Sequence, residues 1–282
     1  MNKPQECKTM TPLRYAGGKS KVVKKLLAPL FPENFEEFYE PFIGGGSVAL
    51  FVAQMHPEKN IHINDLNEKL VNFWKALKTT PIDLVSSLHN LREEYPPHET
   101  GKAKEFLSLL LKRLYESTDP LEIATSYYAL NKISFSGMTE QGSLSVSNYR
   151  KLFNHLNINK LTEINSHMKN FHIYNQHFKD FMKMPSEKDF TFLDPPYMIK
   201  SNNLYGKKGK MHKGFNHEQF YDCVINLSGK WMITYNDNEW IREKYKDFYI
   251  SDAEYRYCMA FETNKNGEKR TRKKNELIIT NY

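Results

Sequence analysis

The hydrophobic pattern of the first third of the chain predicts a β-α-β unit. Apolar positions at helical spacing run through residues 19–31 and end at Pro32. Short apolar runs that begin at Phe38 and Ile61 predict two strands, and residues 48–55 between them have the spacing of a helix. A helix that joins two strands in this way makes them parallel, so the pattern predicts that an α/β fold begins here.

After Leu66 the hydrophobic pattern predicts mainly helices. Strand-like runs are scarce there, and four consecutive segments have apolar residues at helical spacing: 68–77, 81–94, 103–116 and 121–130. A helical block of this length inside an α/β chain indicates an inserted domain. We therefore expect residues 67–169 to form a mostly helical domain, and residues 1–66 and 170–282 to form one α/β domain.

Strands and helices alternate again in the second half of the chain. The pattern predicts helices at 216–227 and 239–245, and strands at 171–174, 190–193, 231–235, 248–250 and 277–280. Together with the two strands of the first third, this predicts a mixed sheet of about seven strands. Tyr235, Asn236 and Asp237 end one of these strands, where they either support a site or form a simple turn.

The sequence Asp194-Pro195-Pro196-Tyr197 carries the most specific chemistry in the chain. The two prolines fix the backbone and offer no N–H groups. The Asp194 carboxylate and the Pro195 carbonyl can then both accept hydrogen bonds from one exocyclic amine. Tyr197 offers an aromatic face, and stacking of a base on such a face contributes roughly 1–3 kcal/mol. These residues predict a pocket for a flat base that bears an amine.

A glycine-rich turn, residues 44–46, follows the strand that begins at Phe38. Glycines allow a backbone to approach a ligand closely, and the amino end of a helix favours a carboxylate or phosphate. Asp65 closes the next strand about 20 residues later, which is the usual position of an acceptor for ribose hydroxyls. The turn and the carboxylate together predict a cofactor that contains a nucleoside.

Two common nucleotide-binding motifs are incomplete in this chain. Ala49 stands where the dinucleotide fingerprint has its third glycine, which disfavours NAD. Leu13 stands where a phosphate-binding loop that ends in Gly18-Lys19-Ser20 would have its first glycine. No apolar strand precedes that loop, so ATP is disfavoured as well.

The charge of the chain suits a polyanionic partner. The 282 residues include 40 Lys and Arg against 33 acidic residues, which gives a net charge of +7. A hydrophobic content of 40% can build a sizeable core. Basic side chains cluster in a loop-like segment after Tyr197 and in a predicted hairpin tip before the last strand: Lys200, Lys207, Lys208, Lys210 and Lys213, then Lys265, Lys269, Arg270, Arg272, Lys273 and Lys274. Both clusters can neutralise phosphates, although solvated lysines are the alternative for the second.

The cysteines and histidines predict neither a disulfide framework nor a metal site. The three cysteines lack paired spacing, and the ten histidines form no ligand pattern. No apolar stretch approaches the ~20 residues that span a membrane, and residues 1–10 have no hydrophobic signal core. We expect a cytoplasmic, nucleoid-associated protein of bacterial or phage origin, without a metal or a membrane partner.

Four motifs, in this order, resemble those of the Dam-type adenine-specific DNA methyltransferases. They are L-R-Y-A-G-G-K at 13–19, E-P-F-I-G-G-G-S at 40–47, Asn64-Asp65, and D-P-P-Y at 194–197. The ending at 275–282 also looks like the last strand of that family. The resemblance implies a Rossmann-like methyltransferase fold whose inserted helical domain recognises the DNA target. It also implies methyl transfer from S-adenosylmethionine to the 6-amino group of adenine in double-stranded DNA after base flipping.

The resemblance also implies roles for individual residues. The catalytic motif would be Asp194, Pro195, Pro196 and Tyr197, with Asp194 beside both the methyl donor and the target amine. S-adenosylmethionine, and S-adenosylhomocysteine as its product, would be bound by Tyr15, Gly18, Lys19, Pro41, Phe42, Gly44, Gly45, Gly46, Ser47, Asp65 and Asp194. Arg14 matches a position where a basic residue touches DNA, and a solvated cation is the alternative.

The predicted recognition loop departs from the best-known members of that family. S-G-M-T-E at 136–140 replaces an Asn-Gly-Leu that is followed by an aromatic residue and an arginine. Because arginine is the commonest bidentate reader of guanine, this difference puts recognition of GATC in doubt. The candidate DNA contacts are Ser136 in this loop, Gln141 and Asn148 as readers of adenine, Lys132 and Arg150 as readers of guanine or phosphate ligands, and Lys207, Lys208 and Lys210 in the basic loop.

Alternatives remain open from the residues alone. The same pocket would accept a cytosine amine, an RNA adenine or a protein amide, and a basic DNA-binding module with a vestigial cofactor fold is a further alternative. Carbon-5 methylation of cytosine is disfavoured, since it needs a covalent intermediate and no cysteine stands near the D-P-P-Y motif. The sequence leaves open whether the protein has a cognate restriction endonuclease as a partner and whether it is a monomer or a weak dimer.

Overall fold

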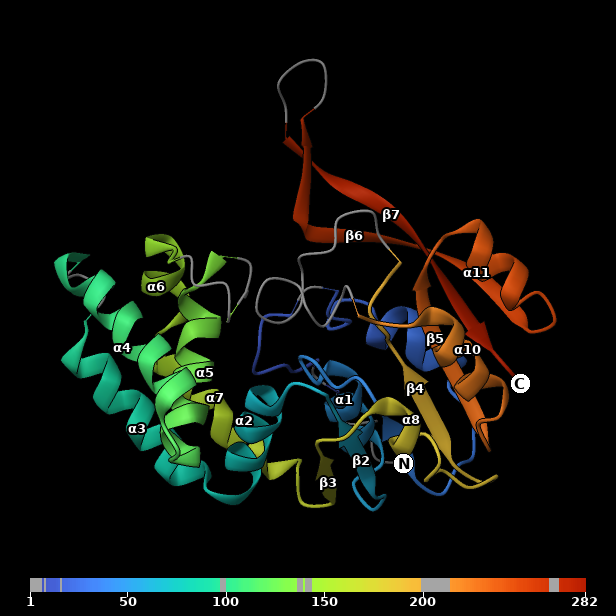
Figure 1. The fold of residues 1–282 in the computed structure, drawn as a ribbon, viewed down its shortest axis with the longest axis horizontal. Helices are drawn as coiled ribbons and strands as arrows, with labels where there is room; N and C mark the ends of the chain where they lie inside the picture. The colour runs from blue at the N-terminus through green and yellow to red at the C-terminus, as the bar shows by residue number, and fades with distance from the viewer. Residues whose placement is uncertain are drawn as a thin grey trace, which may run out of the picture.

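The structure of the chain is a computed structural model. It describes residues 7, 9–15, 17–96, 100–135, 139, 144–198, 214–263 and 269–282. These residues form a seven-stranded sheet toward one end of the molecule and a block of helices toward the other (Figure 1). The α/β fold with a mixed sheet of about seven strands, which the sequence predicted, is confirmed.

The sheet has the strand order β3-β2-β1-β4-β5-β7-β6. The first five strands in this order are parallel, whereas β7 is antiparallel to both of its neighbours, β5 and β6. The strands are β1 (Phe38–Glu40), β2 (Ile61–Asn64), β3 (Phe171–Tyr174), β4 (Phe190–Leu193), β5 (Lys230–Asn236), β6 (Tyr249–Thr263) and β7 (Lys269–Thr280).

The strand order reverses direction between β1 and β4. From β1 the chain passes outward to β2 and β3, and it later places β4 on the other side of β1. In open α/β sheets, ligands bind outside the carboxyl ends of the strands at such a switch point. The residues that follow β1 and β4 therefore meet where this fold favours a binding site.

Both faces of the sheet are covered by helices. Side chains alternate along each strand, so Phe190 and Phe192 of β4 join one core and Leu193 joins the other. The first core includes the π-helical turn η1 (Val23–Leu27) and α1 (Ser47–Met55); the second includes α8 (Phe178–Phe181), α10 (His217–Ile225) and α11 (Glu239–Lys244). A short 3₁₀ turn, η2 (Ala28–Leu30), follows η1.

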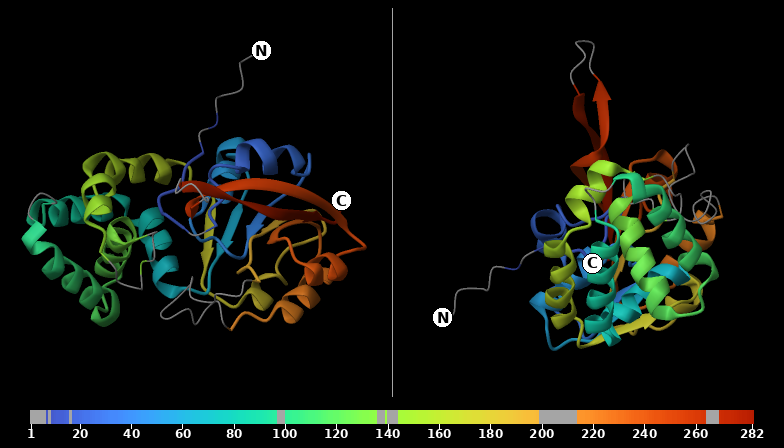
Figure 2. Two further views of the ribbon diagram at one scale, coloured as in Figure 1. Left: turned by 90° about the horizontal axis from the view of Figure 1, so that it is seen from above. Right: turned by 90° about the vertical axis from the view of Figure 1, so that its left-hand side faces the viewer.

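A block of helices lies beside the β3 end of the sheet, as the view from above in Figure 2 also shows. It consists of α2 (Glu68–Thr79), α3 (Pro81–Glu94), the 3₁₀ turn η3 (Thr100–Lys102), α4 (Ala103–Glu116), α5 (Pro120–Ile133), α6 (Val146–Leu152) and α7 (His155–Ser166). Side chains of Asn67, Ser145 and Asn154 cap α2, α6 and α7. Trp74 on α2 belongs to the same core as β1 and β2, so the block is packed directly onto the sheet.

Two predicted helices, 81–94 and 103–116, match α3 and α4 to the residue. The prediction missed α6, α7 and α8: α6 and α8 are short, and α7 is rich in asparagine, although its buried Ile158, Leu161 and Ile164 have helical spacing. The continuous helix expected at 19–31 is wrong. Pro29 lacks an N–H donor within this segment, and the chain forms η1 and η2 instead.

The last two strands are much longer than predicted. Strands β6 and β7 pair with each other through most of their length and form a hairpin that rises above the rest of the molecule in Figure 1. Their outer halves contain several charged residues, and the two strands are defined there by their pairing with each other. Residues 269–274, expected at the tip of a hairpin, lie in β7, and Lys265 lies outside the described residues.

Candidate functional site

The glycine turn between β1 and α1 has no room for side chains. Gly44 and Gly46 have φ angles of 44° and 70°, in the region that favours glycine. The indole N–H of Trp74 donates a hydrogen bond of 3.2 Å to the Gly44 carbonyl. A Cβ on Gly46 would lie 2.4 Å from the same ring. The conformation of the turn is therefore fixed by the glycines and by Trp74 together.

We expect Gly46→Ala to lower the free energy of unfolding by roughly 2–4 kcal/mol, because the left-handed backbone and the overlap with Trp74 both disfavour a Cβ. Denaturant unfolding measures this change. Gly101→Ala is the matched control, because a Cβ at Gly101 meets nothing within 4 Å. Similar stabilities of the two variants would show that the turn tolerates side chains.

Asp65 and Tyr15 hold the glycine turn from two sides. The carboxylate of Asp65, directly after β2, accepts from the N–H of Gly44 at 3.3 Å and from the N–H of Asn67 at 2.9 Å. The ring of Tyr15 packs against Gly44, where a Cβ would lie 2.9 Å from the ring. The Tyr15 carbonyl accepts from the N–H of Gly18 at 3.1 Å. Predicted cofactor-binding residues from separate parts of the chain thus lie together.

The neighbouring residues of the E-P-F-I-G-G-G-S segment also lie at this edge. The carbonyl of Pro41 accepts a hydrogen bond from the side chain of Asn64 at 3.1 Å. Phe42 packs in an aromatic cluster with Phe178 and Phe220, at ring-centroid distances of 5.8 and 5.7 Å. Ser47 is the first residue of α1.

Lys19 connects the amino-terminal segment to the D-P-P-Y motif. Its ammonium lies 2.8 Å from Oδ1 of Asp194 and donates to the Tyr197 hydroxyl at 3.0 Å and to the Gly17 carbonyl at 2.8 Å. The side chain is 2% exposed, whereas Asp194 retains 20% exposure. Thr234 of β5 donates a second hydrogen bond to Oδ1 of Asp194, at 2.7 Å. Asp194 is therefore oriented from two sides and still reaches the surface.

Two buried carboxylates complete this cluster, and the sequence analysis assigned no role to either. Glu276 of β7 is 1% exposed, and its Oε2 lies 3.9 Å from the Lys19 ammonium. Glu40 ends β1 and accepts a hydrogen bond from the N–H of Ala49 in α1 at 2.9 Å. An acidic residue next to an apolar strand run, as in both E-P-F and N-E-L-I-I-T, was the available signal.

Burial changes the protonation of these groups. It raises the pKa of Glu276 to about 7, and the negative charge of Asp194 adds to this effect while the Lys19 ammonium opposes it. Burial likewise raises the pKa of Glu40 well above its usual value, with a smaller contribution from Asp194. The pKa of Tyr197 also rises through burial, so its hydroxyl stays protonated near neutral pH and is hydrogen-bonded to Glu276.

Asn236 fixes the far end of the D-P-P-Y turn. Its amide group accepts from the N–H of Met198 at 2.9 Å and donates to the carbonyl of Met198 at 3.0 Å. This two-point contact ties the end of β5 to the residue that follows the D-P-P-Y motif. Tyr235, on the opposite side of β5, lies 6.0 Å from the ring of Tyr197 and contacts His217.

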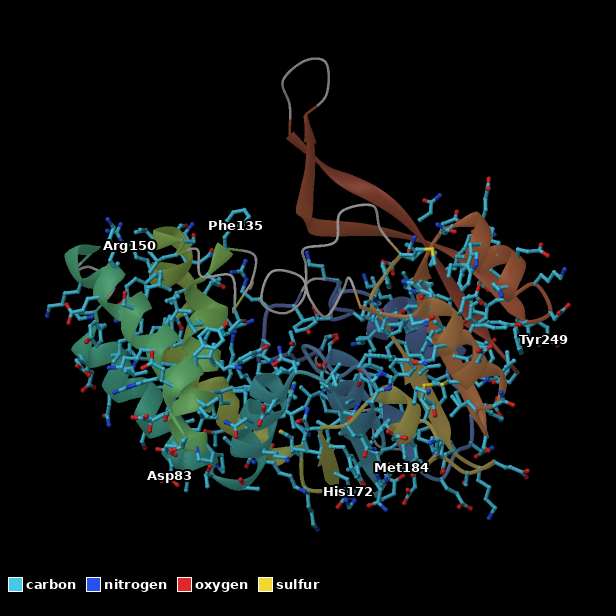
Figure 3. All side chains as sticks on the ribbon, in the orientation of Figure 1. Asp83, Phe135, Arg150, His172, Met184 and Tyr249 are labelled. Atoms are coloured by element: carbon cyan, nitrogen blue, oxygen red, sulfur yellow. The ribbon has the colours of Figure 1, made fainter. Side chains whose placement is uncertain are left out.

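The candidate DNA contacts fall into different environments. Arg14 exchanges two backbone hydrogen bonds with the Asn131 side chain of α5, at 2.8 and 2.9 Å, and its guanidinium donates to the Ser134 carbonyl at 3.2 Å. The side chain of Asn148 donates to the same carbonyl at 2.9 Å. Arg150 lies with exposed Phe135 on the upper rim of the helical block in Figure 3. Arg14, Asn148 and Arg150 are therefore near one rim of the block.

Lys132 differs from these residues because its side chain is inside the helical block. It is 8% exposed, and its ammonium lies 5.0 Å from the centre of the Tyr128 ring. Burial lowers the pKa of Lys132 to about 8, and the nearby charge of Arg14 acts in the same direction. The remaining predicted contacts, Ser136, Gln141, Lys207, Lys208 and Lys210, lie outside the described residues, as do Lys200 and Lys213.

Acidic groups lie close to the glycine turn. Among the described residues, the charges that act on buried Glu40 are those of the Asp194 and Asp65 carboxylates and of the Lys19 ammonium. A positively charged ligand complements such a set, and a ribose suits the Asp65 carboxylate. The residues present therefore fit a nucleoside that carries a sulfonium. Within the described part of the chain, no group of three metal-ligating side chains occurs, and no helix is long and apolar enough to cross a membrane.

Comparisons with known proteins agree with this geometry. The chain is 29% identical over 286 residues to the type II methyltransferase M1.LlaDCHI of Lactococcus lactis subsp. cremoris, which covers 95% of this chain and 94% of that protein. It is 25% identical over 292 residues to the type II methyltransferase M.MjaIII of Methanocaldococcus jannaschii, covering 96% and 98%. The DNA N-6-adenine-methyltransferase of Escherichia phage P1 is 26% identical over 242 residues, covering 83% of this chain and 31% of that protein.

The family match covers the helical block and all of the sheet except β7 and the end of β6. The sequence profile of the D12 class N6 adenine-specific DNA methyltransferases matches residues 15–259. This range begins at Tyr15 and includes the glycine turn, Asp65, the helical block and the D-P-P-Y motif. The resemblance found in the sequence is thereby confirmed: the chain belongs to the D12 class N6 adenine-specific DNA methyltransferase family.

Proposed function

We propose that this adenine-specific DNA methyltransferase uses S-adenosylmethionine as its methyl donor and acts at the junction of β1 and β4. The observation that carries the proposal is the meeting of three separate segments at the switch point. Lys19 contacts Asp194 at 2.8 Å, and Tyr15 from the same segment packs on the glycine turn next to Asp65. One ligand that spans this edge would touch the glycine turn and Asp194 together.

The proposed cofactor site is built on the glycine turn. Asp65 accepts hydrogen bonds from the ribose hydroxyls, and the segment from Pro41 to Ser47 forms the wall beside them. Tyr15, Gly18 and Lys19 close the site from the amino-terminal side. The bound cofactor supplies a methyl group on a positively charged sulfur. Lys19 holds Asp194 in place beside it, because the ammonium pairs with the carboxylate at 2.8 Å.

The proposed target pocket lies at the D-P-P-Y turn. Asp194 and the Pro195 carbonyl accept the two hydrogens of the adenine 6-amino group, which directs the nitrogen lone pair toward the methyl group. Holding nitrogen, carbon and sulfur in line is a positioning task worth several kcal/mol. The base leaves the duplex at a cost of a few kcal/mol, and the ring of Tyr197 offsets part of this by stacking.

Duplex DNA would lie across the rim that joins the two parts of the molecule. We assign residues 1–66 and 170–282 to the catalytic domain and residues 67–169 to target recognition. Arg14 lies where the two parts meet: its backbone is hydrogen-bonded to Asn131 of α5, and its neighbour Tyr15 packs on the glycine turn. Asn148 and Arg150 on the same rim are the proposed contacts to bases or phosphates. Lys132, in contrast, is buried against the ring of Tyr128.

Mass spectrometry of nucleosides tests the reaction. We expect incubation of the chain with S-adenosylmethionine and unmethylated duplex DNA to yield N6-methyladenine, because the pocket places an acceptor pair against an exocyclic amine. Parallel reactions with RNA and with DNA that lacks adenine serve as controls. N4-methylcytosine, methylated RNA or a methylated protein amide as the main product would contradict the assigned acceptor and favour the alternatives that share this pocket.

A further inference from the structure

The carboxylate of Glu276 belongs to the same buried cluster as the proposed catalytic motif, although it comes from the last strand. Its position is set by β7, which pairs with β5 so that Glu276 is opposite Asn236. Asn236 holds Met198, and the adjacent Thr234 holds Asp194. Strand pairing therefore fixes Glu276 relative to both ends of the D-P-P-Y turn.

Among the side chains that the structure describes, the charges in this cluster do not balance. The ammonium of Lys19 faces Asp194 at 2.8 Å and Glu276 at 3.9 Å. With both carboxylates ionised, the three groups have a net charge of −1, which is unfavourable in a site where Lys19 and Glu276 are 2% and 1% exposed. Because Asp194 is nearer to the ammonium and accepts from Thr234, the proton is held more readily by Glu276.

We propose that Glu276 couples the binding of S-adenosylmethionine to proton release: it is protonated in a large fraction of the free enzyme and ionises when the sulfonium binds. This inference rests on the proposed cofactor and goes further by assigning a role to a residue of the last strand. The added positive charge brings the cluster to neutrality, and the proton leaves to solvent. S-adenosylhomocysteine lacks that charge, so its binding leaves Glu276 protonated.

The surroundings of Glu276 support this assignment. From the amino-terminal segment it faces Lys19, and from the D-P-P-Y turn it faces Asp194 and the Tyr197 hydroxyl. On β6 its backbone partner is Ala253, which is apolar. Burial raises the pKa of Glu276 to about 7, so near neutral pH a change in local charge can shift its protonation. The sign follows: the cofactor binds the ionised form better, and its affinity rises with pH.

Calorimetric titration of the intact chain with each of the two ligands tests whether cofactor binding is coupled to ionisation of Glu276. Between about pH 6 and about pH 8, we expect the affinity of the wild type for S-adenosylmethionine, relative to that of Glu276→Gln, to rise about tenfold. The same ratio for S-adenosylhomocysteine should change by less than about twofold. Taking the ratio to the variant removes the titration of the ligands' own amino groups. Glu276→Asp, which keeps a carboxylate, should retain part of the rise.

Glu37→Gln is the matched control. The Glu37 carboxylate is hydrogen-bonded to His62 at 2.8 Å, near the amino ends of the strands and therefore away from the site. The affinity of the wild type relative to that of Glu37→Gln should therefore not change with pH for either ligand. An equal rise in relative affinity for both ligands, or no rise for S-adenosylmethionine, would overturn the inference.

If Glu276→Gln fails to fold, proton release by the wild type tests the inference instead. Titrations in buffers of different ionisation enthalpy should show more proton release with S-adenosylmethionine than with S-adenosylhomocysteine. Absence of any binding would instead reject the proposed cofactor.

Discussion

Asp194→Ala is expected to reduce methyl transfer to adenine by at least about 1000-fold while the chain stays folded. The carboxylate is the acceptor that holds the target amine, and an alanine offers no acceptor in its place. Folding should survive because Asp194 is partly exposed and Lys19 keeps Glu276 as its second carboxylate. Incorporation of tritiated methyl groups into duplex DNA measures the loss, and circular dichroism monitors the fold.

Two further variants sharpen this result. Asp194→Asn retains an oxygen acceptor but lacks the charge that pairs with Lys19, so it should keep more activity than the alanine variant. Asp222→Ala, at an exposed position on α10, is the matched control and should transfer methyl groups at the wild-type rate. Full activity of Asp194→Ala would exclude the D-P-P-Y turn as the reaction site.

Lys19→Met is expected to lower the free energy of unfolding by about 3–5 kcal/mol near pH 8, because it leaves buried Glu276 and partly exposed Asp194 without their cation. Methionine preserves most of the apolar stem, so the change isolates the charge. Without the ammonium, the pKa of Glu276 rises further above its value in the unfolded chain. Such a carboxylate favours the folded state at low pH, and the defect should shrink toward pH 6 as Glu276 takes up a proton. Urea unfolding at both pH values measures this.

Lys112→Met provides the comparison for this variant. Lys112 is exposed on α4, and its replacement should change stability by less than about 0.5 kcal/mol at either pH. A loss at Lys19 that is small, or that is the same at both pH values, would mean that Glu276 and Asp194 do not depend on the ammonium as the buried geometry indicates.

Local sequence was enough to predict the elements of the site. Apolar runs closed by polar residues predicted β1, β2 and β4, and the motifs at their carboxyl ends predicted the glycine turn, Asp65 and Asp194. These strands and turns could be predicted because they are determined by residues close together in the sequence. Strands β6 and β7 were predicted too short, because only the short apolar runs near one end of each strand were used. Their mutual pairing extends both strands well beyond those runs.

Only the tertiary structure showed which charged side chains lie close together in the candidate site. The motif order placed Lys19 and Asp194 in one family pattern, but their distance of 2.8 Å depends on the amino-terminal segment folding back over the glycine turn. Glu276 lies in the family-like ending at 275–282 but had no predicted role, and β7 brings it to the cluster through antiparallel pairing with β5. Lys132, which looked like a DNA ligand in the sequence, is buried against Tyr128 by the packing of α5.

The sequence by itself determined the α/β class, the succession of most helices and strands, and the chemistry offered at the carboxyl ends of β1, β2 and β4. It could do so because turns, caps and hydrophobic periodicity act over short distances along the chain. The tertiary structure decided the raised pKa of Glu276, the position of Lys19 near two carboxylates and the burial of Lys132. Desolvation and charge pairing depend on which distant segments are packed together, and no local pattern encodes that.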